Sequence, residues 1–285
     1  MPTRDERREA AAKNLALMRG AFASETKTTV EAAKIYENGE GRELPVAEAE
    51  GETTTSVTTD FAPKAVFGAQ GKVVVVDPCS FTRPGGAYED GSFGPEQILC
   101  AKSNLYPALR SCKELYHDKN RGYSCGMLFT DRALYLPEVA FVRDGVIRRA
   151  DVLAIPELVR ARAIENHRSE RECEHTLADR IEALLRIAAA NGAETLVVGA
   201  FGCGPQGFAP ELPISLFKAW IEAHPGAIGR IVFAVPRASF AAFDAAFGEK
   251  KEPEPSAAPA PEGDSEEDEF DFDPTDLPEG VTLRA

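Results

Sequence analysis

The sequence lacks any Cys-x-x-Cys pair, although it contains six scattered cysteines: Cys79, Cys100, Cys112, Cys125, Cys173 and Cys203. It has no run of 18 apolar residues, so we expect no membrane-spanning helix. Its first residues, MPTRDERREAAAKN, are charged and contain no apolar segment of the kind that secretory signals require. These absences predict reduced thiols and a cytoplasmic location, or a nuclear one in a eukaryote, and not secretion.

A zinc-like ligand set is also missing. His167, Cys173 and His175 are the nearest approach to one, but they fall in a charged helical stretch without a fourth ligand at zinc spacing. We interpret this stretch as the surface of a helix and expect no metal site.

The formal net charge of −14 is distributed unevenly. Residues 251–285 contain 12 acids and two bases, which leaves the rest of the chain close to neutral. A near-neutral body lacks the basic excess of nucleic-acid-binding proteins, so we expect no direct contact with nucleic acid. We predict a domain at residues 1–249 and a disordered, acidic, proline-rich tail at residues 250–285.

The tail has two interpretations. It could simply increase solubility, or Phe270, Phe272 and Leu277, which stand among the acids, could form a short motif that binds a protein partner.

The body alternates strand and helix patterns. Buried strands are predicted in KVVVVD (72–77), ADVLAIPEL (150–158), ETLVVGAFG (194–202) and RIVFAVP (230–236). Helices are predicted over residues 5–22, 28–37, 96–116, 169–190, 212–223 and 238–247. Residues 121–147 are expected to form a strand pair at the edge of the sheet, and residues 41–56 a polar loop. This alternation predicts an α/β fold with a mostly parallel central sheet and helices on both faces.

Two glycine-rich loops follow predicted strands, where ligands bind in open α/β sheets. The first, PGGAYEDGSFG, follows KVVVVD, and the second, GAFGCGPQGFAP (199–210), follows ETLVV. Glycines at 199, 202, 204 and 207 would leave backbone N–H groups free for a diphosphate, although such glycines also occur in ordinary tight turns. Neither loop is a Walker A motif. The second matches the G-x-G-x-x-G spacing but lacks the acid expected about 20 residues later.

Four stretches follow one another along the chain: PGGAYEDGSFGPEQ, LCAKSNLYPAL, FTDRALYLPEVAFVRD and LVVGAFGCGPQGFAP. In this order they resemble the microbial-type poly(ADP-ribose) glycohydrolase family, a branch of the macrodomains. The resemblance extends from about residue 5 to residue 248. It implies a three-layer α/β/α macrodomain that binds ADP-ribose or an ADP-ribosylated protein, hydrolyses a ribosyl O-glycosidic linkage and needs no cofactor.

The resemblance also suggests where the ligand lies. The diphosphate would contact the 199–208 loop, and the distal ribose would lie near the 84–97 loop, with Glu96 contacting it. The candidate ligand-binding residues are Asp77, Gly85, Gly86, Ala87, Gly199, Phe201, Gly202, Cys203, Gly204, Pro205, Gln206, Gly207 and Phe208.

The chain departs from the family pattern at several of these positions. Ala87 replaces the third glycine of the first loop, and Pro205 and Gln206 replace a hydrophobic residue and an aromatic. Gln97 replaces the glutamate that acts as acid and base in the family. An amide cannot transfer a proton, and the loss of such a group costs about 10²–10⁴ in rate.

Glu96 and Gln97 are therefore the candidate catalytic residues, and each has a simpler interpretation. Pro95 is expected to begin a helix, whose dipole would keep Glu96 ionised and oppose its use as an acid. Gln97 could be a surface amide, and Phe201 and Phe208 could belong to the core. Asp77 could cap the strand or bind a ligand hydroxyl.

Three functions remain open. The chain could be an ADP-ribose glycohydrolase, a non-catalytic ADP-ribose reader whose acidic tail recruits a partner, or an unrelated dinucleotide-binding α/β enzyme.

Overall fold

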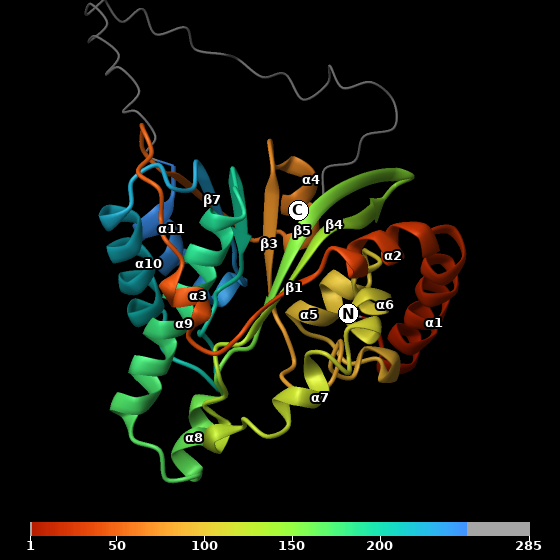
Figure 1. Ribbon diagram of the computed structural model, residues 1–285, viewed down its shortest axis with the longest axis horizontal. Coiled ribbons are helices and arrows are strands. Elements are labelled where there is room, and N and C mark those ends of the chain that lie inside the picture. Colours follow the sequence, from red (N-terminus) through yellow and green to blue (C-terminus); the bar gives the residue numbers. More distant parts are fainter. Residues whose placement is uncertain (1, 250–285) are drawn as a thin grey trace, which may run out of the picture. The chain divides into compact units, whose positions relative to one another are not determined.

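The computed structural model describes residues 2–249, so the acidic tail predicted at 250–285 lies outside the described residues. Within residues 2–249, seven strands form one sheet in the order β1-β4-β5-β3-β6-β7-β2 (Figure 1). The strands are β1 (Lys34–Tyr36), β2 (Thr54–Thr58), β3 (Val73–Pro78), β4 (Ala133–Arg143), β5 (Val146–Ile155), β6 (Thr195–Val198) and β7 (Arg230–Ala234). β5, β3, β6, β7 and β2 run parallel, whereas β4 is antiparallel to both of its neighbours.

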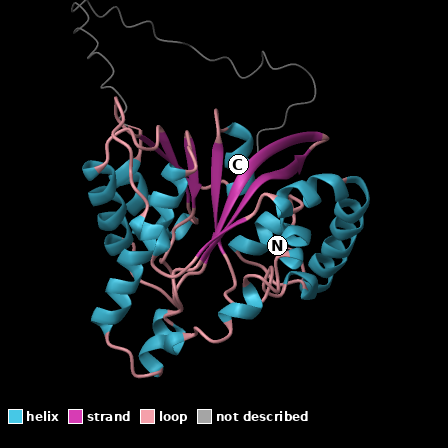
Figure 2. Ribbon diagram, in the orientation of Figure 1, coloured by secondary structure: helices cyan, strands magenta, loops and turns pink. Residues whose placement is uncertain are grey.

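Helices cover both faces of this sheet (Figure 2). The α-helices are α1 (Arg4–Ala21), α2 (Ala23–Glu31), α3 (Glu40–Glu43), α4 (Ala62–Gly68), α5 (Pro95–Cys100), α6 (Leu105–Ser111), α7 (His117–Asn120), α8 (Arg160–Glu165), α9 (Glu170–Ala190), α10 (Glu211–Ala223) and α11 (Arg237–Phe247). Two 3₁₀ turns, η1 (Tyr88–Asp90) and η2 (Cys125–Met127), lie in loops. No helix in this part of the chain is both long enough and apolar enough to span a bilayer.

The alternation of side chains along β3 creates two hydrophobic cores. Val74 and Val76 pack into the core beneath α9, α10 and α11, whereas Val73 and Val75 pack into the core beneath α1, α5 and α6. A continuous valine run suits a strand that is buried on both faces. The predicted three-layer α/β/α fold with a mostly parallel sheet is thereby confirmed.

The single helix predicted over residues 96–116 is wrong. α5 ends at Cys100 and α6 begins at Leu105, because the chain between them pairs with β4. Ser103 bridges Phe141, and the Asn104 side chain accepts a hydrogen bond from the Ala140 N–H at 2.9 Å. These bonds to a strand compete successfully with helix continuation.

Two edge strands were missed, and the ribbon was misplaced. β1 lies inside the helix predicted over residues 28–37, and β2 begins inside the polar loop predicted over residues 41–56. The sequence of β2, TTSVT, is half-buried and lacks an apolar run, so its pattern gives no clear strand signal. Of the strand pair predicted within residues 121–147, only β4 and the first two residues of β5 form, and β1 pairs outside β4, so this segment is not at the edge of the sheet.

Candidate functional site

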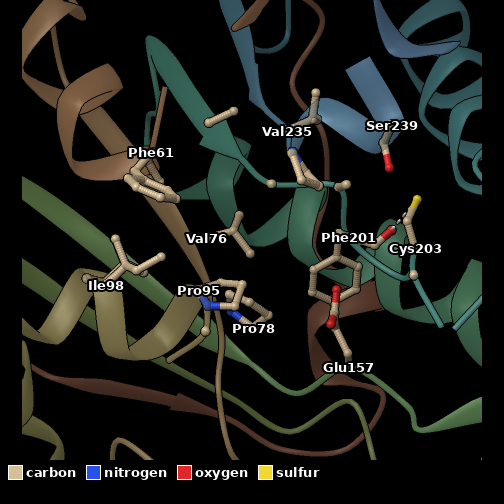
Figure 3. Close-up of a pocket in the computed structure, with 18 of the residues that line it drawn as sticks. Phe61, Val76, Pro78, Pro95, Ile98, Glu157, Phe201, Cys203, Val235 and Ser239 are labelled. Carbon is tan, nitrogen blue, oxygen red and sulfur yellow. Dashed lines mark hydrogen bonds between the residues drawn. The ribbon is translucent and has the colours of Figure 1, made fainter. Parts of the chain in front are cut away.

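A cavity of about 350 Å³ opens at the carboxyl ends of the parallel strands (Figure 3). This is the position at which open α/β sheets bind ligands. Its walls come from the ends of β2, β3, β6 and β7 and from the first turns of α4 and α5, and they are mainly apolar. The lining residues are Thr59, Asp60, Phe61, Ala62, Val76, Pro78, Phe93, Gly94, Pro95, Ile98, Leu99, Glu157, Gly199, Ala200, Phe201, Cys203, Gly204, Ala234, Val235, Pro236 and Ser239.

Two exposed aromatic rings flank this cavity. Phe61 and Phe93 are 57% and 45% exposed, and their rings meet edge to face with centroids 6.2 Å apart. The Arg7 guanidinium carbon lies 5.7 Å from the Phe93 ring centre. Exposed aromatics beside a cavity are typical of ligand sites. Neither ring was among the predicted residues: Phe93 lies within the first predicted glycine loop, whereas Phe61 follows β2, a strand that was not predicted.

The first glycine loop folds back tightly over α5 and α6. Gly85 and Gly86 have positive φ angles of 65° and 56°. A β-carbon on Gly85 would lie 2.4 Å from the Tyr106 ring, and one on Gly86 would lie 2.8 Å from Gln97 Nε2. Only glycine fits both the backbone angle and the space. The two glycines therefore allow the loop backbone to pack directly against Tyr106 and Gln97.

Arg83 forms a salt bridge with the first glycine loop: its Nη2 lies 2.7 Å from Asp90 Oδ2. Because both side chains are about half exposed, the pair adds little stability. It joins the residue that precedes the loop to η1 in the middle of the loop.

α5 begins at Pro95, as predicted, and brings the Glu96 side chain inward. Glu96 is only 4% exposed, and its Oε2 accepts a hydrogen bond from the Ser80 N–H at 3.1 Å. Its Oε1 is buried and has no hydrogen-bond partner among residues 2–249. The interpretation of Glu96 as a mere surface acid at a helix end is therefore excluded.

Asp77 at the end of β3 forms a buried acid pair with Glu96. Asp77 is fully buried, and neither of its carboxyl oxygens has a hydrogen-bond partner within the described chain. Burial raises the pKa of Asp77 well above its ordinary value, and the charge of Glu96 raises it further. Unpartnered buried acids with raised pKa values are a recognised mark of functional sites.

The predicted ionisation of Glu96 by the helix dipole is wrong in direction. Burial raises the pKa of Glu96, although the backbone N–H groups of Ser80 and Gly85 act in the opposite direction. α5 is only six residues long, and a dipole contributes about 0.3–1 kcal/mol. The free-energy cost of desolvating a buried carboxylate is larger than this dipole contribution, so the net effect is a raised pKa.

Gln97 connects the first loop to α5. Its Nε2 donates to the Gly85 carbonyl at 3.1 Å and lies 3.4 Å from Glu96 Oε2. The amide therefore holds the glycine loop beside Glu96, which is a structural task that needs no proton transfer. Its side chain is half-buried and is not a freely exposed surface amide.

The second loop is closed by its own hydrogen bonds. The N–H groups of Cys203, Gly204, Gly207 and Phe208 donate to loop carbonyls at 2.8–3.2 Å. The Gly202 N–H donates to Glu157 Oε1 at 2.6 Å. The expectation that the N–H groups of Gly202, Gly204 and Gly207 are free is therefore corrected: each already has a protein acceptor.

The aromatic residues of the second loop differ in role. Phe201 is buried and lines the cavity (Figure 3). Phe208 packs in the core, where the Arg160 guanidinium carbon lies 5.3 Å from its ring centre. Pro205 and Gln206 are exposed at the loop tip and do not line the cavity.

The predicted residues thus fall into two adjacent groups. Gly199, Phe201, Cys203 and Gly204 line the cavity, whereas the remaining predicted residues do not line it: Asp77, Gly85, Gly86, Ala87, Glu96, Gln97, Gly202, Pro205, Gln206, Gly207 and Phe208.

Pro78 and Pro95 are part of the cavity wall, and each is the chain neighbour of one of the buried acids (Figure 3). The acid pair therefore sits directly behind that wall.

Glu157 is an acid of this site that was not among the predicted residues. It lies two residues beyond the end of β5, lines the cavity and binds the second loop. The strand predicted over residues 150–158 included Glu157, whereas β5 ends at Ile155, so the sequence did not place this acid at the carboxyl end of a strand, where ligands bind.

The comparisons with known proteins agree with this geometry. Residues 7–144 match a family model described as the catalytic domain of microbial-type PARG, poly(ADP-ribose) glycohydrolase. No curated protein matches the chain significantly.

Several solved structures are similar. The poly(ADP-ribose) glycohydrolase of Thermomonospora curvata is 25% identical, with a TM-score of 0.70 over 81% of this chain and 93% of that one. The same enzyme bound to the inhibitor ADP-HPD is 26% identical, with a TM-score of 0.70 over 84% of this chain and 99% of that one. The enzyme of Deinococcus radiodurans in complex with ADP-ribose is 25% identical, with a TM-score of 0.69 over 77% and 96%.

The fold, the two glycine loops beside a cavity at the strand ends, and these matches lead to one assignment. Residues 7–144 of this chain match the catalytic domain of the microbial-type poly(ADP-ribose) glycohydrolase family, and residues 2–249 have a fold similar to that of the bacterial poly(ADP-ribose) glycohydrolase structures.

Proposed function

We propose that this chain binds ADP-ribose in the cavity at the strand ends and hydrolyses an ADP-ribose O-glycosidic linkage, with Glu96 as the proton donor. The match to the family model supports the class of reaction. The related structures from Thermomonospora curvata and Deinococcus radiodurans, which hold ADP-HPD and ADP-ribose, support the class of ligand.

The cavity suits the nucleoside part of such a ligand. Its walls are mainly apolar, and Phe61, Phe93 and Phe201 offer ring faces and edges to a base. Asp60 and Ser239 add polar groups that can orient it. Apolar walls with a few polar groups are the usual composition of small-molecule sites.

The buried Asp77–Glu96 pair is the observation that carries the proposed chemistry. Cleavage of a glycosidic bond needs a proton on the departing oxygen while positive charge develops on the ribose. Two acids buried together cannot both ionise easily, so the pair retains a proton near neutral pH. A carboxylic acid kept neutral in this way can serve as a general acid.

Gln97 favours a second candidate function, that of an ADP-ribose reader without catalysis. The amide occupies the position of the family's acid and base glutamate and hydrogen-bonds the Gly85 carbonyl. The Glu96 oxygen that lacks a partner is also buried. In this second function, the same cavity binds the ligand and no bond is broken.

A hydrolysis assay separates the two functions. The wild-type protein, Glu96→Gln and Gln97→Glu are each incubated with ADP-ribosylated protein, and released ADP-ribose is measured by chromatography. The proposed function predicts release by the wild type and a loss of about 10²–10⁴-fold in Glu96→Gln. An inactive wild type beside an active Gln97→Glu variant would identify a reader instead.

The division into a domain at 1–249 and a tail at 250–285, a protein partner for that tail and a cytoplasmic location are also proposals. Deletion of residues 251–285 should leave ADP-ribose affinity and hydrolysis unchanged within error, because each proposed site residue precedes the tail. A change in affinity of more than about threefold on deletion would assign the tail a part in the site.

A further inference from the structure

We propose that Glu157 controls the access of the ligand's diphosphate to the 199–208 loop, so that binding of ADP-ribose takes up a proton. This inference rests on the proposed function and concerns the same site.

The position of Glu157 places its carboxyl group at the loop. Its Oε1 accepts the Gly202 N–H at 2.6 Å, and its side chain lines the cavity below Phe201 (Figure 3). A short hydrogen bond between a backbone N–H and a carboxylate is the contact that a phosphate oxygen would otherwise make. The side chain thus occupies an anion position inside the protein.

Four further N–H groups of the loop are also occupied. The N–H groups of Cys203, Gly204, Gly207 and Phe208 are bound to loop carbonyls. A diphosphate that contacts the loop at Gly202 competes with Glu157 for the Gly202 N–H or lies close to the Glu157 carboxyl group. In both cases, an ionised Glu157 repels the ligand.

Little positive charge relieves this repulsion. The charge of Arg180 in α9 acts on Glu157, but Arg180 is buried and donates to the Leu128 carbonyl at 3.1 Å and to the Pro156 carbonyl. Arg160 of α8 is paired with Glu170. Neither guanidinium forms a hydrogen bond or ion pair with Glu157.

The other titratable groups near Glu157 do not supply positive charge. Cys203 belongs to the loop, Asp60 lies on the wall of the same cavity, and Glu211 at the start of α10 acts on Cys203. Burial raises the pKa of Glu157 to about 7, although the Gly202 N–H and Arg180 oppose the shift. The group can therefore change its charge near neutral pH.

The neutral form of Glu157 suits the diphosphate in two ways. It carries no charge to repel the phosphates, and its carboxyl proton can be donated to a phosphate oxygen. If the complex forms only with neutral Glu157, affinity falls with the fraction of protonated side chain. The association constant then decreases about tenfold per pH unit above the pKa and stays constant well below it.

Calorimetry provides the test. ADP-ribose is titrated into the wild-type protein and into Glu157→Gln at pH 6, 7, 8 and 9, each in two buffers that differ in ionisation enthalpy. The wild type should bind about tenfold more weakly at pH 8 than at pH 6 and take up close to one proton at pH 8. Glu157→Gln keeps an oxygen for the Gly202 N–H but cannot ionise, so its affinity should vary with pH clearly less than that of the wild type.

Two controls isolate the diphosphate and the residue. Adenosine lacks the diphosphate, so its affinity for the wild type should be independent of pH. Glu211→Gln removes a nearby exposed acid outside the cavity and should retain the wild-type pH dependence.

A wild-type affinity for ADP-ribose that is the same from pH 6 to pH 9, or an equal pH dependence in Glu157→Gln, overturns this inference while the proposed function stands. Absence of ADP-ribose binding in both proteins overturns the proposed function and this inference with it. If Glu157→Gln does not fold, proton uptake by the wild type in the paired buffers still decides the question.

Discussion

At the scale of single residues, the protonation of Glu96 depends on its surroundings more than on its place in a helix. Its neighbours along the chain, Pro95 and Gln97, predict a helix start, and the structure confirms this start. Its burial beside Asp77 could not be predicted, because it requires β3 and α5 to converge. Sequence thus identifies the carboxyl group, whereas only the fold determines its charge.

The first prediction concerns Asp77. A buried acid without partners destabilises the folded state, by roughly 1–3 kcal/mol for an unsatisfied group. The pKa of Asp77 is raised in the folded protein, so the unfolded chain loses its proton at a lower pH. The folded state then binds more protons, and stability is lost as pH rises above the unfolded pKa.

Asp77→Asn should therefore raise the free energy of unfolding by about 1–3 kcal/mol at pH 8, and by less at pH 4. Urea denaturation at the two pH values measures both changes. A variant that is less stable than the wild type at pH 8 would show that Asp77 has a stabilising partner.

At the scale of elements, the first glycine loop and α5 act as one unit. Gly85 places its backbone against Tyr106, and Gln97 holds the Gly85 carbonyl. The glycine pattern in the sequence predicts a glycine-rich loop after β3, but it does not identify Tyr106 as the residue against which the loop packs. The break between α5 and α6 was unpredictable for the same reason, because it depends on bonds to β4.

The second prediction compares two glycines with positive φ angles. Gly145, in the turn between β4 and β5, has a φ of 78° and open space around it. Gly145→Ala should cost about 1–2 kcal/mol of stability, from backbone strain alone. Gly85→Ala adds a clash with Tyr106 and should cost clearly more.

Thermal and urea unfolding of both variants measure the difference. Equal losses of stability would mean that the Tyr106 ring moves away freely and that the loop is not tightly packed. A larger loss in Gly85→Ala, together with weaker ADP-ribose binding, would link the packing of this loop to the site.

At the scale of the whole described domain, the order of strands brings the two glycine loops together. β3 and β6 are neighbours and parallel, so the loops that follow them emerge at the same edge of the sheet. The valine run of β3 and the short strand β6 were both predicted. The position of Glu157 beside the second loop was not predicted, because it depends on the order of the strands in the folded sheet, in which β5 lies next to β3.

The limits of prediction follow from this arrangement. Local sequence patterns indicate buried strands and amphipathic helices, so the layers of the fold could be predicted from the sequence. Edge strands such as β2 carry weak patterns. Residues that line the cavity, such as Phe61 and Ser239, come from different elements and meet only in the folded chain. Local patterns therefore do not identify them.

Calorimetric titration with ADP-ribose tests the central claim most directly, because both candidate functions require this ligand to occupy the cavity at the strand ends. The wild-type protein and Ser239→Ala should show saturable binding at pH 6, where Glu157 is mainly neutral. Ser239→Trp, which fills the cavity, should lose it. Absence of heat from the folded wild-type protein at millimolar ADP-ribose, or undiminished binding by Ser239→Trp, would contradict the account.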